Sequence, residues 1–404
     1  MKKLNTLFFT VFNPRCIRGI GMYFDSSKAA KWHKSVAANR HENITRYAWY
    51  GIFLISTSLW YLCFFWIHFI SLYFSNKHPN TQPFKTKTMA DILFLGLWVG
   101  VKPQNYFQLE LFKSPRDNWF NYIFIEEQLT WYVNFNHRHR SIKDFNNDIA
   151  TLSNKHLFSK LLIKSKLPAI SELAFISTQS DNKHEMLNNA IDSQIEKNQD
   201  FFIKPLSENS MRGCLVANIN SDIDDCSAHG FDLKRKHINL KNKSEIARYL
   251  TNFLTILSIE HKHHSGLLFQ KLLVNSKEMV ELTQSKKLSV IRIITCISRK
   301  KFKPKVIYSF LENEISKQRR LLHWKQFQIN VDTGLCEIGK IKQWDDIKEI
   351  AVACHELYPS IVSLAWDIAI CQEGIRVIEG NYGWGTIEPQ SITGVGALEN
   401  GLVE

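Results

Sequence analysis

The segment that most constrains the fold lies near the end of the chain, Trp366–Asn381, and its residue pattern predicts a β-hairpin. Apolar residues alternate on both sides of Gln372–Gly374, a three-residue loop that ends in glycine, where a positive φ is favoured. Successive side chains of a strand point to opposite faces. One face of the hairpin therefore carries polar groups, and the other points into a core through Trp366, Ile368, Ile370 and Ile378.

Two carboxylates meet on the polar face of this hairpin. If Cys371 pairs with Ile375, Asp367 lies directly opposite Glu379, and Asn381 joins them from two positions along the strand. Like charges placed in this way destabilise a sheet, so the pair predicts a bound cation. Oxygen ligands suit Mg²⁺, and substrate phosphates usually complete its coordination shell, which points to a nucleotide. The alternative is a solvent-facing surface that happens to hold three polar residues.

Two cationic side chains lie in apolar strand patterns. Lys204 comes near the end of the short strand Phe201–Pro205, where an anion would offset the cost of burying its charge. The alternative for Lys204 is a side chain that extends into solvent. Arg292 lies between apolar neighbours in Ser289–Thr295, which predicts a phosphate or acyl-phosphate partner. The alternative for Arg292 is a structural salt bridge with an acidic residue.

The order of these motifs resembles the ATP-grasp superfamily. Within it, Trp-Asp-Ile-Ala-Ile followed by Glu-Gly-Asn-Tyr-Gly-Trp-Gly is similar to the sugar-transfer-associated ATP-grasp family of bacterial surface-polysaccharide loci. The resemblance covers the chain from about Leu97 onward and is most specific at the hairpin. It implies an α+β ATP-grasp fold, in which two α+β lobes hold the nucleotide between them. A small helical region and an N-terminal hydrophobic helix would precede these lobes.

The resemblance also implies the cofactors ATP and Mg²⁺ and a set of site residues. Asp367, Glu379 and Asn381 would be the metal ligands, and Arg292 and Lys204 the catalytic groups. The helix that Asn154 opens, running to Ser165, would present Lys155 to a phosphate, and backbone groups near Lys271 would read the adenine. The nucleotide contacts implied in this way are Lys155, Lys204, Ser210, Arg212, Gly213, Gln270, Lys271 and Leu272.

The chain departs from the family pattern in two places. The loop that should cover the phosphates, Ser207–Cys214, contains one glycine instead of several. The segment between the arginine strand and the hairpin lacks the usual pair of adjacent glycines, although the Asp332–Gly334 turn is retained. Nucleotide binding is therefore better supported by the sequence than turnover.

The chain is expected to have four parts. Residues 1–46 form a basic tail, 47–75 a membrane-associated hydrophobic helix, 76–150 a mostly helical lead-in region, and 151–404 the ATP-grasp domain. The run Tyr47–Phe74 has no formally charged residue and exceeds the roughly 20 residues that span a bilayer. Both of its flanks are basic, which favours a helix lying in the inner leaflet, at the cytoplasmic face of a bacterial inner membrane, over a simple crossing. The alternative is a helix buried in the domain core.

The net charge of +13 predicts an anionic partner. No nucleic-acid-binding signature accompanies this charge, so ATP, anionic lipid or a lipid-linked phosphosugar explains it better. The eight cysteines include no CxxC pair, which indicates reduced thiols and no zinc site. The histidines of His261–His264 are read as a solvated turn.

The activity that the resemblance implies is ATP-dependent ligation of a carboxylate to an amine or similar nucleophile through an acyl phosphate. A small-molecule or lipid-linked sugar would be the acceptor. Two alternatives stay open: a phosphotransferase that acts on a hydroxyl, and a non-catalytic nucleotide-binding component of a membrane glycan assembly. The sequence identifies neither the substrates nor the oligomeric state.

Overall fold

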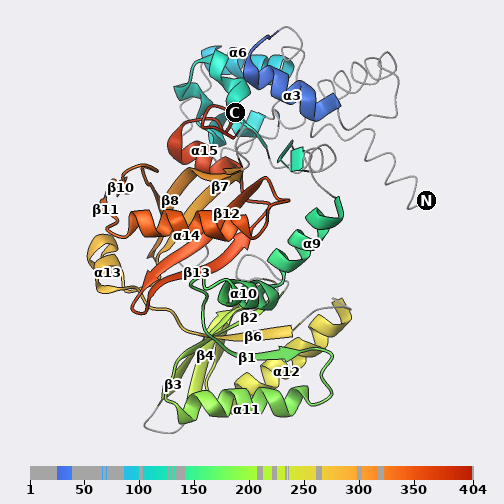
Figure 1. The fold of residues 1–404 in the computed structure, drawn as a ribbon, viewed down its shortest axis with the longest axis vertical. Coiled ribbons are helices and arrows are strands. Elements are labelled where there is room, and N and C mark those ends of the chain that lie inside the picture. Colours follow the sequence, from blue (N-terminus) through green and yellow to red (C-terminus); the bar gives the residue numbers. More distant parts are fainter. Residues whose placement is uncertain are drawn as a thin grey trace, which may run out of the picture.

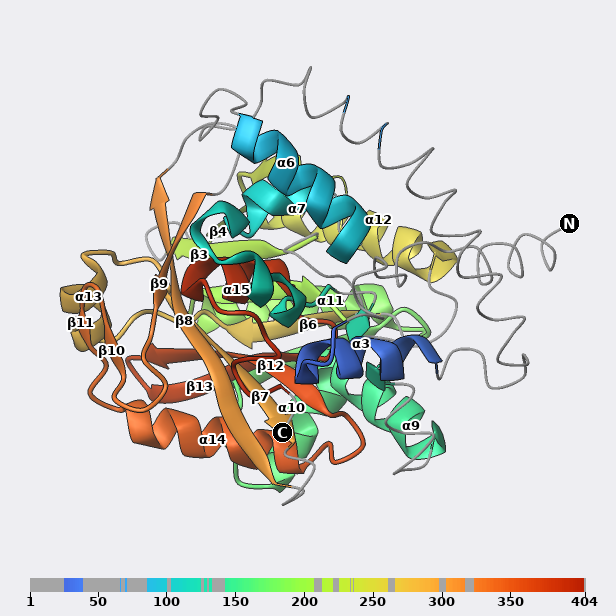
Figure 2. The same cartoon turned by 90° about the horizontal axis from the view of Figure 1, so that it is seen from above.

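The computed structural model describes residues 25–38, 66, 70, 86–99, 103–124, 127–128, 131–132, 142–206, 213–220, 225–232, 234, 236–260, 266–297, 303–316 and 323–402. Three layers follow one another along the longest axis of the molecule (Figure 1). Helices lie at one end, a sheet in the middle and a second sheet at the other end. Figure 2 gives the view from above, in which α3, α6 and α7 lie in front of the two sheets.

The first sheet, called here the N-lobe sheet, is antiparallel throughout. Its order is β1 (Glu172–Ser177), β6 (Gly266–Lys271), β2 (Phe201–Pro205), β3 (Leu215–Asn220), β4 (Asp225–Phe231) and β5 (His237–Leu240). Two helices, α11 (Lys183–Glu196) and α12 (Lys243–Glu260), cover one face. Phe201, Ile203 and Phe269 point into the core beneath these helices. The alternate strand positions therefore face away from the helices.

The second sheet, called here the C-lobe sheet, is also antiparallel. Its order is β13 (Gly374–Asn381), β12 (Ser363–Cys371), β7 (Val290–Ile297), β8 (Pro304–Ser316) and β9 (His323–Gln328). The helix α14 (Trp344–Glu356) packs on one face, where Trp366 and Ile368 are fully buried. Smaller elements complete this lobe: α13 (Lys277–Thr283), β10 (Leu335–Cys336), β11 (Gly339–Lys340) and α15 (Ile387–Thr393).

Two helices, α9 (Ile142–Ser153) and α10 (Lys155–Lys164), lead into the sheets, and α10 lies between them (Figure 1). The Asn154 side chain caps α10 by accepting hydrogen bonds from the backbone N–H groups of His156 and Leu157, each at 3.1 Å. The helix ends at Lys164 and Ser165 is its C-cap, so the predicted start is confirmed and the predicted end lies one residue too far.

The described residues between 86 and 121 are mostly helical. They contain α6 (Thr86–Phe94), a π-helical turn (Leu95–Val99), α7 (Pro103–Gln108) and two 3₁₀ turns (Leu111–Lys113 and Arg116–Asn121), and α3 (Lys28–Ala38) precedes them within the residues that the sequence assigned to a basic tail. These segments share a core built around Trp119 and Tyr106. No helix of the described residues combines the length and apolarity needed to cross a membrane. The predicted hydrophobic helix lies outside the described residues, apart from Trp66 and Ile70.

Candidate nucleotide site

The hairpin of β12 and β13 places Asp367 directly opposite Glu379, as predicted. The predicted pairing of Cys371 with Ile375 is wrong, because Cys371 pairs with Gly374. The two registers differ by one residue, and a β-bulge after Asp367 restores the expected alignment. Gly374 has a φ of +94°, which explains the glycine at this turn.

The bulge also changes which residue of β13 enters the core. Val377, at 1% exposure, takes the buried place that was predicted for Ile378, which is half-buried. Beyond the bulge, Asn381 lies two positions from Glu379, and its Nδ2 donates a hydrogen bond to Glu379 Oε1 at 3.1 Å. The carboxylate and the amide therefore share one face of the strand.

Arg292 lies on β7 directly across from Asp367. The guanidinium donates two parallel hydrogen bonds to that carboxylate, from Nε to Oδ1 at 2.7 Å and from Nη2 to Oδ2 at 2.8 Å. This is the salt bridge that the sequence left open as the alternative to a phosphate partner. Burial, together with the like charge of Glu379, holds the pKa of Asp367 above its usual value, although Arg292 acts in the opposite direction.

Lys204 is almost fully buried on β2, with 5% of its surface exposed. It shares a sheet face with its cross-strand partner Leu268, whereas Phe201 and Ile203 enter the core on the other face. Burial and the neighbouring charge of Lys155 lower the pKa of Lys204 to about 8, although Glu379 favours its charged form. Because Lys204 is buried and faces away from the lobe's own core, an anion bound beside it would stabilise its charged form.

Lys155 stands in the first turn of α10, and its Nζ donates a hydrogen bond to the carbonyl oxygen of Leu206 at 3.3 Å. Its charge acts on Glu379 together with that of Lys204. Burial favours the protonated form of Glu379, but these two lysines hold its pKa below the usual value. Lysines of α10 and the N-lobe sheet thus face an ionised carboxylate of the C-lobe hairpin.

The segment at the end of β6 holds the predicted adenine contacts. The Gln270 side chain is 3% exposed, and among the described residues its Oε1 has no hydrogen-bond partner. The backbone N–H of Lys271 donates to the Ser171 carbonyl at 3.2 Å, and that of Leu272 donates to the Asp200 carbonyl at 3.4 Å. These two N–H groups are therefore already engaged within the protein.

Of the predicted phosphate loop, only Gly213 and Cys214 are described; Ser210 and Arg212 lie outside the described residues. Gly213 has a φ of +69°, and a Cβ at this position would lie 2.4 Å from the ring of Phe253. The one glycine of this loop is therefore required by backbone conformation and by packing.

The sequence did not single out two acidic residues that lie on the same faces as the predicted site. Glu312 shares a face of the C-lobe sheet with Arg292, because β7 and β8 pair Val290 with Glu312, and it accepts a hydrogen bond from Gln326 at 2.8 Å. Glu172, at the start of β1, lies directly opposite Gln270. Only their position in otherwise apolar strand patterns could have marked them in the sequence.

The donor chemistry of the hairpin fits Mg²⁺, since Asp367, Glu379 and Asn381 offer only oxygen ligands. Each oxygen of Asp367 accepts one hydrogen bond from Arg292 and keeps a second lone pair, so Asp367 could bind a metal without losing this ion pair. Within the described part of the chain, no group of three or more His, Cys, Asp or Glu side chains is placed to hold a metal. The predicted set holds two carboxylates and an amide and would not form such a group.

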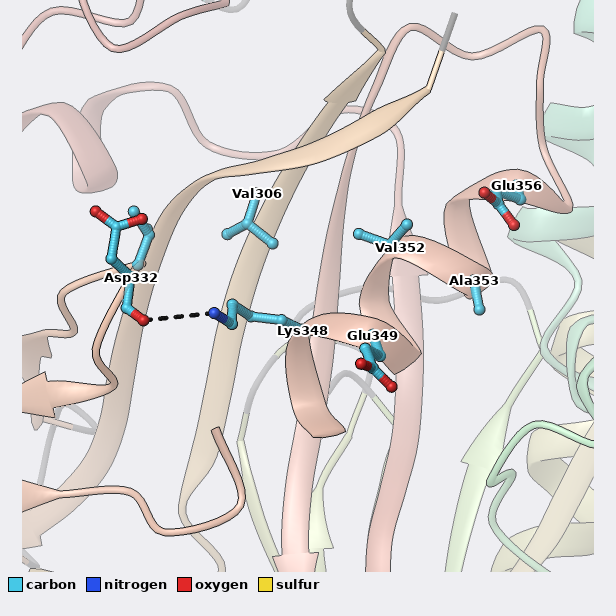
Figure 3. Close-up of a pocket in the computed structure, with 8 residues that line it drawn as sticks. Val306, Asp332, Lys348, Glu349, Val352, Ala353 and Glu356 are labelled. Carbon is cyan, nitrogen blue, oxygen red and sulfur yellow. Dashed lines mark hydrogen bonds between the residues drawn. The ribbon is translucent and has the colours of Figure 1, made fainter. Parts of the chain in front are cut away.

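A cavity of about 430 Å³ opens elsewhere, between α14 and β8 (Figure 3). Val306, Val352 and Lys348 line it, and Lys348 Nζ donates a hydrogen bond to the Asp332 carbonyl at 3.4 Å. It adjoins α14, which covers the face opposite to that of Asp367. None of the predicted site residues lines this cavity.

The two lobes, with lysines facing a carboxylate hairpin, have the arrangement expected of an ATP-grasp protein. Residues 134–334 match the family described as sugar-transfer associated ATP-grasp. This segment, about half of the chain, belongs to that family, as the sequence motifs predicted. The match ends before the hairpin, so the assignment of Asp367 and Glu379 depends on the geometry given above.

Solved structures show weaker similarity. The ATP-grasp ligase PsnB, complexed with a minimal precursor, is 14% identical over 67% of this chain and 67% of its own, with a TM-score of 0.35. D-alanine–D-alanine ligase from Bacillus anthracis is 11% identical over 63% of this chain and 66% of its own, with a TM-score of 0.36. Biotin carboxylase from Campylobacter jejuni, in a β-γ-ATP complex, is 12% identical over 62% of this chain and 45% of its own, with a TM-score of 0.40. Overlaps this loose do not assign a reaction. No curated protein matches the chain.

Proposed function

We propose that this protein is an ATP- and Mg²⁺-dependent ligase that joins a carboxylate to an amine or a similar nucleophile. The observation that carries the proposal is the meeting of Lys155 and Lys204 with Glu379 between the two sheets, where the lysine charges keep the carboxylate ionised. Cations placed to hold phosphates, facing oxygen ligands for a divalent metal, are what a bound metal–nucleotide complex requires.

The reaction would proceed in two displacements. A substrate carboxylate oxygen attacks the γ-phosphorus of ATP, the bond to ADP breaks, and an acyl phosphate forms. The nucleophile then attacks the acyl carbon, phosphate leaves, and the nucleophile loses a proton. Lys155 and Lys204 would hold the phosphates, and Arg292 would neutralise the transferring group. Bound Mg²⁺ would supply further charge neutralisation at the phosphates.

Arg292 also supports a second candidate function. Its guanidinium donates two hydrogen bonds to Asp367, so contact with a phosphoryl group competes with an internal ion pair. Together with the single glycine of the phosphate loop, this favours a nucleotide-binding component without turnover as the alternative. A phosphotransferase acting on a hydroxyl is the third possibility.

The reaction products separate these functions. Protein incubated with ATP, Mg²⁺ and candidate acceptors should release ADP and inorganic phosphate if it ligates, seen by ³¹P NMR. It should give ADP and a phosphorylated acceptor if it is a phosphotransferase, and neither if it only binds.

Glu379→Ala and Asp367→Ala should each abolish magnesium-dependent nucleotide binding in calorimetry. Asp345→Ala should not, because Asp345 is an exposed carboxylate of the same lobe. Unchanged binding in both site variants would contradict the site.

We further propose that the acceptor is a small-molecule or lipid-linked sugar, used in making or modifying cell-surface polysaccharide at the cytoplasmic face of the inner membrane, and that nucleic acid is not a partner. The support is the family description, the net charge of +13 and the uncharged run Tyr47–Phe74. Deleting residues 47–74 should move the protein to the soluble fraction. Persistent sedimentation with membranes would argue against the attachment.

A further inference from the structure

Cys214 differs in its surroundings from the other cysteines that the structure describes. It is half-buried, whereas the other five are buried: Cys226, Cys296, Cys336, Cys354 and Cys371. Burial raises the pKa of Cys226 to about 11 and that of Cys354 to about 12, so these thiols stay protonated and unreactive at neutral pH. Among the described cysteines, Cys214 is therefore the one that a reagent can reach.

The fold places Cys214 directly beside Lys204. β2 and β3 pair Ile203 with Leu215, so the next step of this antiparallel register sets Lys204 opposite Cys214. The strand pairing extends this far on the other side, because the backbone N–H of Phe231 donates to the Cys214 carbonyl at 3.0 Å. Ile203 and Leu215 enter the core beneath α11 and α12. Lys204 and Cys214 therefore share the opposite face of the sheet.

Two cations act at this position. Lys204 is 5% exposed, and its ammonium makes no hydrogen bond or ion pair with any residue that the structure describes. The charge of Lys155 disfavours the charged form of Lys204, whereas a Cys214 thiolate favours it. Glu379 offsets one of the two positive charges. A net positive charge remains beside the sulfur, and it favours both the thiolate and an incoming anion.

We propose that Cys214 is a modification site at which an anionic disulfide blocks nucleotide binding. This inference rests on the proposed nucleotide site. The Cys214 thiolate attacks one sulfur of the disulfide, the S–S bond of the reagent breaks, and its other half leaves as a thiolate with the electron pair. The disulfide is itself the oxidant. The group left on Cys214 places its negative charge against Lys204, where it competes with the phosphates of the nucleotide.

The exchange is reversible, which makes the modification a switch. A second thiol attacks the mixed disulfide and releases Cys214, so nucleotide binding follows the ratio of disulfide to thiol in the surroundings. Lys204 pairs either with a phosphate or with the anion on Cys214. Oxidising conditions therefore stop the use of ATP before any chemical step begins.

The test uses the whole chain and two aliphatic disulfides of opposite charge. Dithiodiglycolate carries two carboxylates, and cystamine carries two ammonium groups. The rate of modification at Cys214, measured by peptide mass spectrometry, is divided by the rate at which the same disulfide reacts with 2-mercaptoethanol. This normalised rate should be at least about tenfold higher for dithiodiglycolate, because the cations attract it. ADP with Mg²⁺ should slow the reaction, and Lys204→Met should reduce the advantage of the anionic reagent several-fold.

Calorimetry with ADP and Mg²⁺ measures the consequence for binding. Protein treated with dithiodiglycolate should bind ADP about ten- to a hundredfold more weakly, because a charged hydrogen bond from Lys204 is lost. Dithiothreitol should restore the original affinity. Cys214→Ser, compared with itself before and after treatment, should show no change. Cys226→Ala, which removes a buried thiol of β4 in the same sheet, should lose affinity on treatment as the unsubstituted protein does.

Several results would overturn this inference and leave the proposed nucleotide site intact. Cys214 could stay unmodified, its normalised rate could be no higher with dithiodiglycolate than with cystamine, or its modification could leave the affinity for ADP unchanged. A loss of affinity in treated Cys214→Ser would assign the effect to another cysteine and overturn it equally. Failure of ADP to bind the untreated protein would instead overturn the proposed function and this inference with it.

Discussion

At the residue scale, the central interaction is the buried fork between Arg292 and Asp367. Asp367 is 6% exposed, and Arg292 satisfies both of its oxygens. Removing one partner of such a pair leaves an uncompensated charge, which is more costly than removing both. Breaking the pair should therefore destabilise the C-lobe whether or not Arg292 also contacts a phosphate.

Arg292→Leu should lower the free energy of unfolding by about 3 kcal/mol, measured by urea denaturation at pH 8. The loss should be smaller at pH 5, because Asp367 without its partner is neutralised by protonation. Arg292→Leu combined with Asp367→Leu should recover much of the loss. Asp345→Ala, which breaks an exposed pair with Lys348, should cost less than about 1 kcal/mol. Equal losses for the buried and exposed pairs would contradict this account.

Lys204 gives the site a specific pH dependence. Its pKa is lowered from 10.5 to about 8 in the folded protein. The buried charge therefore lowers the free energy of unfolding below pH 8, and this free energy should rise as the pH increases from 8 toward 10.5. Phosphate binding requires the charged amine. Affinity for ADP should therefore fall by up to roughly tenfold per pH unit above 8, measured by calorimetry. Lys204→Met should bind weakly at all pH values and lack this dependence; a wild-type affinity flat from pH 7.5 to 9.5 would contradict it.

At the element scale, the hairpin of β12 and β13 depends on close packing at Gly380, which lies between Glu379 and Asn381. A Cβ at Gly380 would lie 2.6 Å from the Trp366 ring and 2.7 Å from Leu152. Trp366 is fully buried, and its indole N–H donates to Thr295 at 2.8 Å, so the ring cannot move away easily. The position of the polar pair thus depends on a core contact of the opposite face.

Gly380→Ala should destabilise the C-lobe by about 1–3 kcal/mol and weaken magnesium-dependent nucleotide binding, because β13 must move away from β12. Gly394→Ala is the control, since a Cβ there meets nothing within 4 Å and only the positive φ of +66° adds strain. The penalty of Gly380→Ala should shrink when Trp366 is replaced by Phe. Thermal unfolding of the unsubstituted protein, Gly380→Ala, Trp366→Phe and the double variant tests this. A penalty for Gly380→Ala that is the same in the Trp366→Phe background would contradict it.

At the scale of the whole molecule, the two sheets are joined by the connection that follows β6 and by an ion pair beside it. Lys271 Nζ lies 2.5 Å from Glu373 Oε1 at the tip of the hairpin. Both side chains are more than a third exposed, so the pair adds little to stability. Its effect should instead appear in how readily the two lobes separate.

Glu373→Lys places two cations together and should raise hydrogen exchange of the connection from Leu272 to Ser276, with a change in unfolding free energy of less than about 1 kcal/mol. Exchanging the two charges, with Lys271→Glu added, should restore the wild-type exchange. Raising the salt concentration should reduce the difference between the variants. If hydrogen exchange is the same in the single and the double variant, this ion pair does not hold the two lobes together.

Much of the local structure is readable from the residues alone. The Asn154 cap, the alternation of the hairpin strands and the meeting of Asp367 with Glu379 follow from rules that act over a few positions. The sequence predicts the pairing of Cys371 one residue away from its observed partner, Gly374, because no local rule reveals the bulge after Asp367. The bulge follows the Asp367–Glu379 pair, which lies next to the tight contact between Gly380 and Trp366 in the packed core.

Residue type and spacing thus establish which side chains are charged, which face of a strand they occupy and which family they resemble. The fold establishes which of these charges meet. Arg292 faces Asp367 because β7 and β12, far apart in the chain, are neighbours in one sheet, and Lys204 acts on Glu379 because two separate sheets face each other. Electrostatic energy depends on distance and burial, and both are properties of the assembled chain.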